Sequence, residues 1–306
     1  MDYCYVDYDL AYLLGAIVAR GEIFRENSIT RIIIHYPFRN LEVEGINTVI
    51  NVREKLSLGL DKIVNRFNEL GFDRVQKEPL EYEVQIIIEM KTGGIADRVL
   101  KCHLGNAINH AEFHIPRAIF QAADVNIKLE FMRGYADVAG HVRKSNAYKN
   151  GRHRVYIDVL NPNWHLPVEL CQLLQDHLEV PVQTITWGHP NIRDPRGKDR
   201  EGAWAREHQI KVFADEYERI GFYIDYKMDV LHQLAEYNRT HNLVSNLKFC
   251  DCEPSKKTKP PHPAENDPRL PDNIRGMHFN SYREICRVMG CPRCRKWGDV
   301  TKYVQP

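Results

Sequence analysis

Two pairs of closely spaced cysteines lie near the end of the 306-residue sequence. One residue separates the members of the first pair, and two residues separate those of the second. Tetrahedral Zn²⁺ takes four such thiolates, and a short spacing lets one turn of the chain supply two of them. Four cysteines leave no open coordination position, so we expect a structural zinc whose binding contributes to folding. The expected ligands are Cys250, Cys252, Cys291 and Cys294, with His262 and His278 as alternatives to one thiolate.

The composition is that of a soluble globular protein, with 43% hydrophobic and 27% charged residues and a formal net charge of +1. The first ten residues are acidic and do not form a secretory signal. No apolar run approaches the roughly 18 residues that a membrane span needs. We therefore expect a cytoplasmic protein that has no membrane partner.

One sequence unit occurs twice and organises the elements of the chain. "YLLGAIVARGEI" (12–23) and "FMRGYADVAGHV" (131–142) align at an offset of 119 residues, which places Gly15 over Gly134 and Gly21 over Gly140. Each copy is typical of a helix that ends near its second glycine and passes into a strand. The first is followed by expected strands at 30–38 and 82–91 around a helix within 45–72. The second is followed by expected strands at 153–160, 182–187 and 208–214 and helices at 167–178 and 215–224.

The element order is thus αββαββα, twice, which predicts an α+β fold with helices covering one face of each sheet. We expect one unit over 1–124, a second over 125–244, and a small appended zinc module over 245–306, where prolines are frequent. Gly15 and Ala19 lie four residues apart on one helix face, and Gly134 and Val138 have the same spacing. Small residues at this spacing let two helices approach closely, so the ends of the two repeated helices should meet.

These two motifs resemble the signature helices of LAGLIDADG homing endonucleases in their single-chain, pseudo-dimeric form. The resemblance covers roughly residues 9–235 and includes the αββαββα order. It implies a pseudo-twofold saddle of two antiparallel sheets that lie in the major groove of DNA. It also implies an acidic residue before the second glycine of each motif, and these two carboxylates hold divalent metal over the scissile phosphates.

The sequence departs from this family at those two positions, which are Arg20 and Ala139. A guanidinium stays charged and cannot ligate Mg²⁺, and alanine offers no ligand. We therefore expect no catalytic residues of the family type. Arg20 contacts phosphate in one interpretation and is a solvated cation at a helix end in the other. Glu22 and Asp137 are the carboxylates that could rescue cleavage.

Basic residues should mark the DNA-facing surface, since they bind phosphates and base edges. Residues 141–154 contain five Lys or Arg and no Asp or Glu. Residues 187–209 also contain five Lys or Arg, but together with four Asp or Glu. The alternative is that both are ordinary solvated loops. The candidate DNA-contacting residues are Arg20, Arg31, His35, Arg39, Arg143, Lys144, Lys149, Arg152, Arg154, Arg193, Arg196, Lys198 and Arg200.

The leading interpretation is sequence-specific recognition of duplex DNA without cleavage by this chain, which would be associated with the nucleoid when bound. It would act as the recognition subunit of a restriction or mobile-element system or as a regulator. Two unlike halves suit a non-palindromic site bound by a monomeric pseudo-dimer, with a separate cleavage or modification subunit as a further partner. One alternative is an active Mg²⁺-dependent DNA endonuclease that uses displaced carboxylates. The others are an RNA-binding, maturase-like protein and a duplicated α+β protein with no nucleic-acid role.

Overall fold

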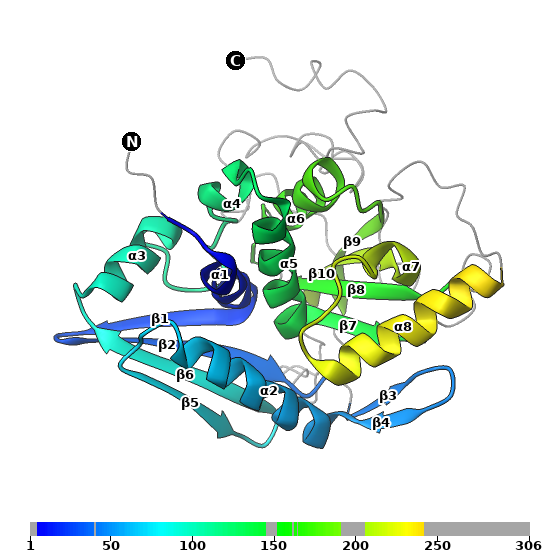
Figure 1. Cartoon of the computed structure of the whole chain (residues 1–306), viewed down its shortest axis with the longest axis horizontal. Coiled ribbons are helices and arrows are strands. Elements are labelled where there is room, and N and C mark those ends of the chain that lie inside the picture. Colours follow the sequence, from blue (N-terminus) through cyan, green and yellow to red (C-terminus); the bar gives the residue numbers. More distant parts are fainter. Residues whose placement is uncertain are drawn as a thin grey trace, which may run out of the picture.

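A computed structural model describes residues 5–39, 41–144, 152–160, 162–163, 165–190 and 206–241. These residues form two units of α+β architecture that repeat one topology (Figure 1). Each unit contains a four-stranded antiparallel sheet, and the two sheets lie on either side of a central pair of helices. The zinc module expected over 245–306 lies outside the described residues.

The first unit begins with helix α1 (Tyr8–Arg20), which passes directly into the hairpin β1 (Gly21–Glu26) and β2 (Ile29–Pro37). The Asp7 carboxylate caps α1 by accepting a hydrogen bond of 2.8 Å from the Leu10 backbone N–H. The following elements are β3 (Glu42–Glu44), β4 (Val49–Asn51), α2 (Val52–Asn68), β5 (Arg74–Pro79), β6 (Glu83–Lys91), α3 (Ile95–Leu104) and α4 (Arg117–Gln121). The sheet has the order β1-β2-β6-β5.

The second unit begins with helix α5 (Val125–Ala139), which passes directly into β7 (Gly140–Arg143). Then follow β8 (Arg154–Leu160), α6 (Leu166–Gln172) with a π-helical turn (Leu173–His177), β9 (Val182–Pro190), β10 (Arg206–Phe213), α7 (Ala214–Tyr217) and α8 (Asp225–Thr240). The sheet order is β7-β8-β10-β9, which matches the first sheet position by position. The expected duplicated αββαββα topology, with two antiparallel sheets, is therefore confirmed.

Each sheet has an inner face that packs against helices and an outer face on the opposite side. Along β2, Ile32, Ile34 and Tyr36 point inward and are fully or nearly fully buried, whereas Arg31 and His35 point outward. This alternation is the period of two that a strand with one buried face requires. The inner faces join the helices in one continuous hydrophobic core.

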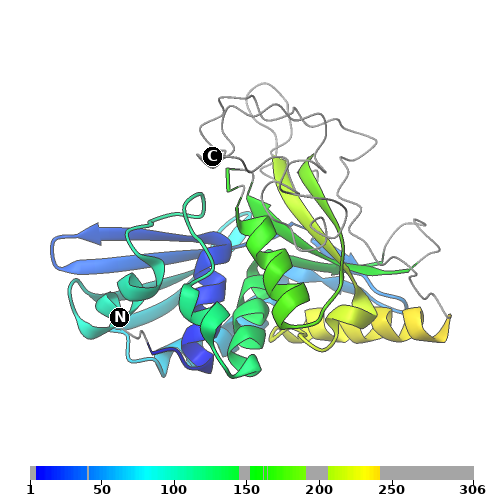
Figure 2. The same ribbon diagram turned by 90° about the horizontal axis from the view of Figure 1, so that it is seen from above.

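Helices α1 and α5 lie side by side at the centre of the molecule (Figure 2). They pack so closely that only glycine fits at their crossing. A Cβ atom at Gly15 would lie 2.0 Å from the backbone oxygen of Phe131, and one at Gly134 would lie 2.0 Å from the backbone oxygen of Tyr12. Tyr12 and Phe131 are themselves equivalent in the repeat, so the contact is reciprocal. The expectation that small residues let the two helices approach is confirmed at these two positions.

Several element boundaries differ from those expected. The segment 45–72 begins with the turn and second strand of the β3–β4 hairpin. Its helix starts only at Val52, where the Asn51 side chain accepts a hydrogen bond from the Arg53 backbone N–H. The closing helix expected at 215–224 is instead the short α7 followed by the longer α8. Gly221 separates them with a positive φ of 72°, a left-handed conformation that ends a helix. The short helices α3 and α4 were not expected.

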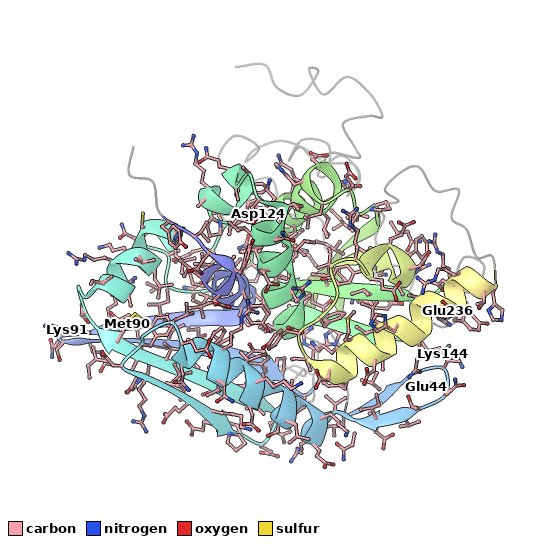
Figure 3. All side chains as sticks on the ribbon, viewed as in Figure 1. Glu44, Met90, Lys91, Asp124, Lys144 and Glu236 are labelled. Carbon is pink, nitrogen blue, oxygen red and sulfur yellow. The ribbon has the colours of Figure 1, made fainter. Side chains whose placement is uncertain are left out.

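The hairpin β3–β4 of the first unit reaches across to the second unit (Figure 3). The backbone N–H of Lys144 donates a hydrogen bond of 3.2 Å to the backbone oxygen of Glu44, and their side chains form an exposed ion pair. Within the described part of the chain, no helix has both the length and the apolar character to cross a membrane.

The reciprocal glycine contact gives a first testable prediction. Gly15→Ala and Gly134→Ala should each lower the free energy of unfolding by about 3 kcal/mol or more, because the added methyl group meets backbone rather than a movable side chain. Urea unfolding followed by circular dichroism measures this change.

Gly59→Ala in α2 is the matched control. The nearest atom to its added Cβ is the Cγ2 methyl of the Ile224 side chain at 2.9 Å, which can shift. The gain in helix propensity of about 1 kcal/mol then offsets the packing change. Equal effects at Gly15 and Gly59 would contradict the close-contact account.

Candidate nucleic-acid interface

Arg20 lies at the end of α1, where the two repeated helices meet, and is buried. Its guanidinium donates a hydrogen bond of 2.6 Å from Nη2 to Oε1 of Glu207 on β10, and its side chain is 7% exposed. The structure thus places Arg20 in an ion pair between the two units, which matches neither the expected phosphate contact nor a solvated helix end. The physical reason is the buried carboxylate of Glu207, which the sequence alone did not place there.

Arg39, just after β2, completes what we call the central charge cluster. It binds Glu207 through both carboxylate oxygens, at 2.6 Å and 2.5 Å, and also binds the Asp158 carboxylate of β8. Its side chain is 1% exposed, so the structure places Arg39, a predicted DNA-contacting residue, in contacts within the protein. The cluster comprises Arg20, Arg39, His141, Asp158, Glu207 and Gln209.

Two polar side chains beside Asp158 complete its environment. His141 Nε2 lies 2.9 Å from Asp158 Oδ2 and 3.2 Å from Arg39 Nη1, and the Gln209 amide donates to Asp158 Oδ1 at 2.9 Å. Burial lowers the pKa of His141 to about 4, against the opposing effect of Asp158. Burial would raise the pKa of Asp158, but Arg39 and His141 outweigh it and hold that pKa below its usual value. At neutral pH the cluster therefore contains two guanidinium cations, two carboxylates and a neutral imidazole.

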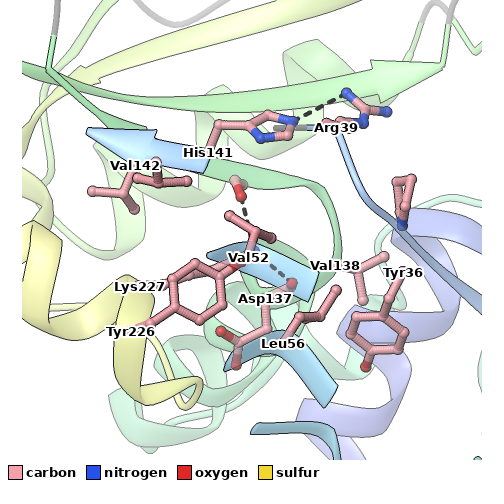
Figure 4. Close-up of a pocket in the computed structure, with 13 residues that line it drawn as sticks. Tyr36, Arg39, Val52, Leu56, Asp137, Val138, His141, Val142, Tyr226 and Lys227 are labelled. Atoms are coloured by element: carbon pink, nitrogen blue, oxygen red, sulfur yellow. Dashed lines mark hydrogen bonds between the residues drawn. The ribbon is translucent and has the colours of Figure 1, made fainter. Parts of the chain in front are cut away.

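The cluster borders a small cavity of about 30 Å³, roughly the share of liquid volume that one water molecule takes (Figure 4). Lys227 of α8 lines this cavity and donates to the backbone oxygens of Asp137 at 2.7 Å and Gly140 at 2.9 Å. These are carbonyls at the end of α5, so the ammonium group acts as a cap at the negative pole of that helix. Burial lowers the pKa of Lys227 to about 8.

The two carboxylates considered for rescued cleavage lie apart from the cluster contacts. Asp137 is 1% exposed and accepts hydrogen bonds from the Tyr12 hydroxyl at 2.7 Å and the Tyr223 backbone at 3.0 Å. Its carboxylate therefore links the helix pair to the segment before α8. Glu22 lies on the outer face of the first sheet, with Oε2 3.7 Å from His35 Nε2. Ala139, the other motif position, is fully buried.

The outer face of the second sheet carries a group that we call the second-sheet cationic patch, formed by Arg143, Arg154 and Lys211 around Tyr156. Arg143 and Arg154 lie directly opposite each other on β7 and β8, and Lys211 lies opposite Tyr156. The Arg143 guanidinium stacks 4.8 Å from the Tyr156 ring centroid, and Lys211 Nζ lies 5.9 Å from it. Burial lowers the pKa of both arginines.

The two arginines of this patch have unused donors. Arg154 is 6% exposed, and its Nε and Nη2 atoms are buried without a hydrogen-bond partner; the same holds for Nε of Arg143. The Tyr156 side chain is a hydrogen-bond partner of both guanidinium groups, and no ion pair joins either of them to a carboxylate of the described residues. Buried cationic donors without an acceptor are unfavourable, so this arrangement favours an anion as partner.

Four other predicted DNA-contacting residues have protein partners. Arg152 pairs with Asp215 and lies 4.0 Å from the Phe213 ring centroid. Arg31 pairs with Glu89 at 2.8 Å, His35 with Glu83 at 2.8 Å, and Lys144 with Glu44 at 3.4 Å. Arg31 and Lys144 remain about half exposed, so these pairs do not remove them from the surface.

The remaining predicted residues lie outside the described part of the chain. They are Lys149, Arg193, Arg196, Lys198, Arg200 and the cysteines Cys250, Cys252, Cys291 and Cys294. Within the ranges that the structure describes, no three His, Cys, Asp or Glu side chains are grouped so that they could hold a metal ion.

The sequence analysis missed the strand residues that complete the site: Tyr156, Asp158, Glu207, Gln209 and Lys211. The sequence pattern that could have indicated them is the polar or aromatic residue at every second position of two strands, "RVYIDVL" and "EHQIKVF", whose remaining residues are mostly apolar. That alternation identifies one outward face. It does not reveal which residues of two strands lie opposite each other, because this depends on register.

No protein-family model matches the chain. No curated protein matches it either. Similar solved structures include one described as "full-length DUF199/WhiA from Thermatoga maritima", at 13% identity and a TM-score of 0.40, covering 78% of this chain and 66% of that one. Mesophilic variants of the homing endonuclease I-DmoI match at 14% identity and a TM-score of 0.37, over 72% of this chain and 95% of theirs. I-DmoI in complex with DNA and Ca matches at 16% identity and a TM-score of 0.36, over 69% and 86%.

Burial of His141 predicts a specific dependence of stability on pH. Its folded-state pKa of about 4 lies below the ordinary value of 6.5, so unfolding takes up a proton between these values. The free energy of unfolding should therefore fall on acidification through this window, by roughly 2–3 kcal/mol at pH 4.5 from His141 alone. Urea unfolding of the wild type and of His141→Gln at pH 7.5, 6.0 and 4.5 measures this contribution.

His232→Gln serves as the control, since its side chain lies on α8 and is 54% exposed. It should leave the slope of the wild type nearly unchanged, whereas His141→Gln should flatten it. A slope that is the same in all three proteins would show that His141 is not the buried neutral imidazole described here.

Proposed function

We propose that this chain binds duplex DNA in a sequence-dependent way, through the outer face of its second sheet. The chain would serve as a recognition subunit in a restriction or mobile-element system, or as a regulator. It would act as a monomeric pseudo-dimer on a non-palindromic site, with a separate subunit cutting or modifying the DNA where such chemistry occurs.

The observation that carries this proposal is the cross-strand pair Arg143 and Arg154. Like charges directly opposite each other on neighbouring strands are destabilising, and buried guanidinium donors without acceptors add to this. A phosphate oxygen bound by Arg143, the more exposed of the two, would relieve both effects. Lys211 on the next strand extends the positive charge across the sheet, as binding to a row of phosphates requires.

We further propose that the chain does not cleave DNA by the metal mechanism that its motif resemblance implies. The two motif positions carry Arg20 and Ala139, and Arg20 is held against Glu207. A fixed guanidinium there repels a divalent cation. Asp137 is occupied by hydrogen bonds that position α8 against the helix pair, which argues against its use as a displaced metal ligand.

The proposal predicts which charges control affinity for DNA. Arg143→Gln and Lys211→Gln should each weaken binding to a selected duplex at least tenfold and lower the dependence of log K on log[salt] by about one. Lys55→Gln is the control, because this exposed lysine lies on α2, away from both outer faces. Binding is measured by fluorescence anisotropy on a duplex enriched from a random library, at several salt concentrations.

Three outcomes would contradict the proposal. Weak binding to every duplex, with an affinity that does not depend on salt, would support the alternative of a protein with no nucleic-acid role. Stronger binding to structured RNA than to the selected duplex would support the maturase-like alternative. Cleavage of duplex DNA in the presence of Mg²⁺ that disappears in Asp137→Asn or Glu22→Gln would support an endonuclease with displaced carboxylates.

We also propose a structural Zn²⁺ bound by Cys250, Cys252, Cys291 and Cys294. Purified protein should contain about one zinc per chain, and Cys291→Ser should lose it. Cys171→Ala is the control, since this cysteine is buried within the second unit. Elemental analysis of both variants measures the zinc content, and full zinc occupancy in Cys291→Ser would contradict the proposed ligand set.

A further inference from the structure

We propose that DNA contacts only one of the two sheets: the duplex lies on the outer face of β7-β8-β10-β9, and the outer face of β1-β2-β6-β5 does not take part. This inference rests on the proposed function and makes it more specific. It departs from what a pseudo-dimer with two equivalent halves would do, which is to read two half-sites.

The charges on the outer face of the second sheet are predominantly positive. By strand register, this face carries the cations Arg143, Arg154 and Lys211 and the carboxylates Asp158 and Glu207. Both carboxylates are already bound by Arg20 and Arg39, which come from the first unit. Counting these two arginines, five cations face two carboxylates. A duplex that approaches this face therefore meets a net positive field.

The charges on the outer face of the first sheet have the opposite balance. Register places five carboxylates on this face and only three Lys or Arg. The carboxylates are Glu22, Glu26, Glu78, Glu83 and Glu89, and the cations are Arg31, Arg74 and Lys91. Phosphates are repelled by such a surface, and each carboxylate brought next to DNA loses favourable solvation.

Two of the three cations on this first face also lie near a carboxylate. Glu89 lies 2.8 Å from Arg31 and 3.9 Å from Arg74, so one carboxylate is near two guanidinium groups. The same face exposes Phe24 by 43% and Ile29 by 47%, which offer nothing to a phosphate. Such side chains suit contact with a protein surface better than contact with a nucleic-acid backbone.

The asymmetry arises because the first unit contributes its central arginines to the second. Arg20 at the end of α1 and Arg39 just after β2 pair with Glu207 and Asp158 of the second sheet. Among the described ion pairs, a Lys or Arg of the second unit pairs with a carboxylate of the first only at Lys144 and Glu44, which is exposed and lies on the β3–β4 hairpin, not on the first sheet. In the central charge cluster, both described carboxylates of the second outer face are therefore paired with arginines of the first unit. The carboxylates of the first outer face receive no arginine or lysine from the second unit among the described ion pairs.

The test compares both ends of the bound duplex and both sheets of the protein. The full chain is incubated with the duplex enriched from a random library, and the protected sugars are mapped by hydroxyl-radical footprinting. Matched charge reversals are made on the two faces: Arg143→Glu on the second sheet and Arg74→Glu on the first, where the side chain is 61% exposed. Circular dichroism and thermal unfolding verify that both variants are folded, and Lys211→Gln provides a milder change on the second sheet.

We expect protection that extends to one side of the motif centre only, and a duplex that can be shortened on the other side with less than a twofold change in Kd. Arg143→Glu and Lys211→Gln should weaken binding at least tenfold, whereas Arg74→Glu should change Kd less than twofold. The double variant Glu26→Gln, Glu78→Gln should extend the footprint toward the first sheet.

Protection of similar length on both sides would overturn the one-sheet inference while leaving the proposed function intact. An equal loss of affinity in Arg74→Glu and Arg143→Glu would do the same. If no duplex is enriched at all, the proposed function itself fails, and the one-sheet inference fails with it.

Discussion

The contact between the backbones of α1 and α5 at Gly15 and Gly134 is the constraint on which the other features depend. Because each glycine faces a backbone oxygen of the other helix, the two helices cannot slide or rotate without a clash. Their ends, Arg20 and Ala139, are therefore held together at the centre of the molecule. β1 and β7 leave directly from these ends, so the same contact also determines where the two sheets begin.

The central charge cluster follows from that geometry. Bringing the helix ends together places Arg20 beside β10 of the other unit, where Glu207 accepts its hydrogen bond. The cost of removing two guanidinium groups and two carboxylates from water offsets most of their mutual attraction, so we assign the cluster a role in orientation more than in net stability. Arg39 and Arg20 share one oxygen of Glu207, and this shared contact ties the end of β2 to the end of α1 and both to the second sheet.

The backbone features were predictable from the sequence because their causes are local. Glycine spacing indicated the helix pair, and period-two alternation indicated β2, β6 and β8 within a few residues. The cluster was not predictable, because Asp158 and Glu207 meet Arg39 only through the register of β8 and β10 and the placement of a distant strand end. Likewise, the burial of Arg20 depends on a residue 187 positions away, and the motif around it contains no sign of that partner.

The two units therefore share backbone requirements without sharing surface chemistry. A glycine at the helix crossing is required in both, since any side chain there meets a carbonyl oxygen, and the strand order follows from the same chain path. An outward side chain on a strand meets no such requirement, because its Cβ points away from the core. This explains how one sheet can carry paired carboxylates and exposed apolar side chains while its counterpart carries opposed arginines. A duplicated fold is thus compatible with one-sided binding: helix packing constrains the units to resemble each other inside, and leaves the charge of each outer face independent.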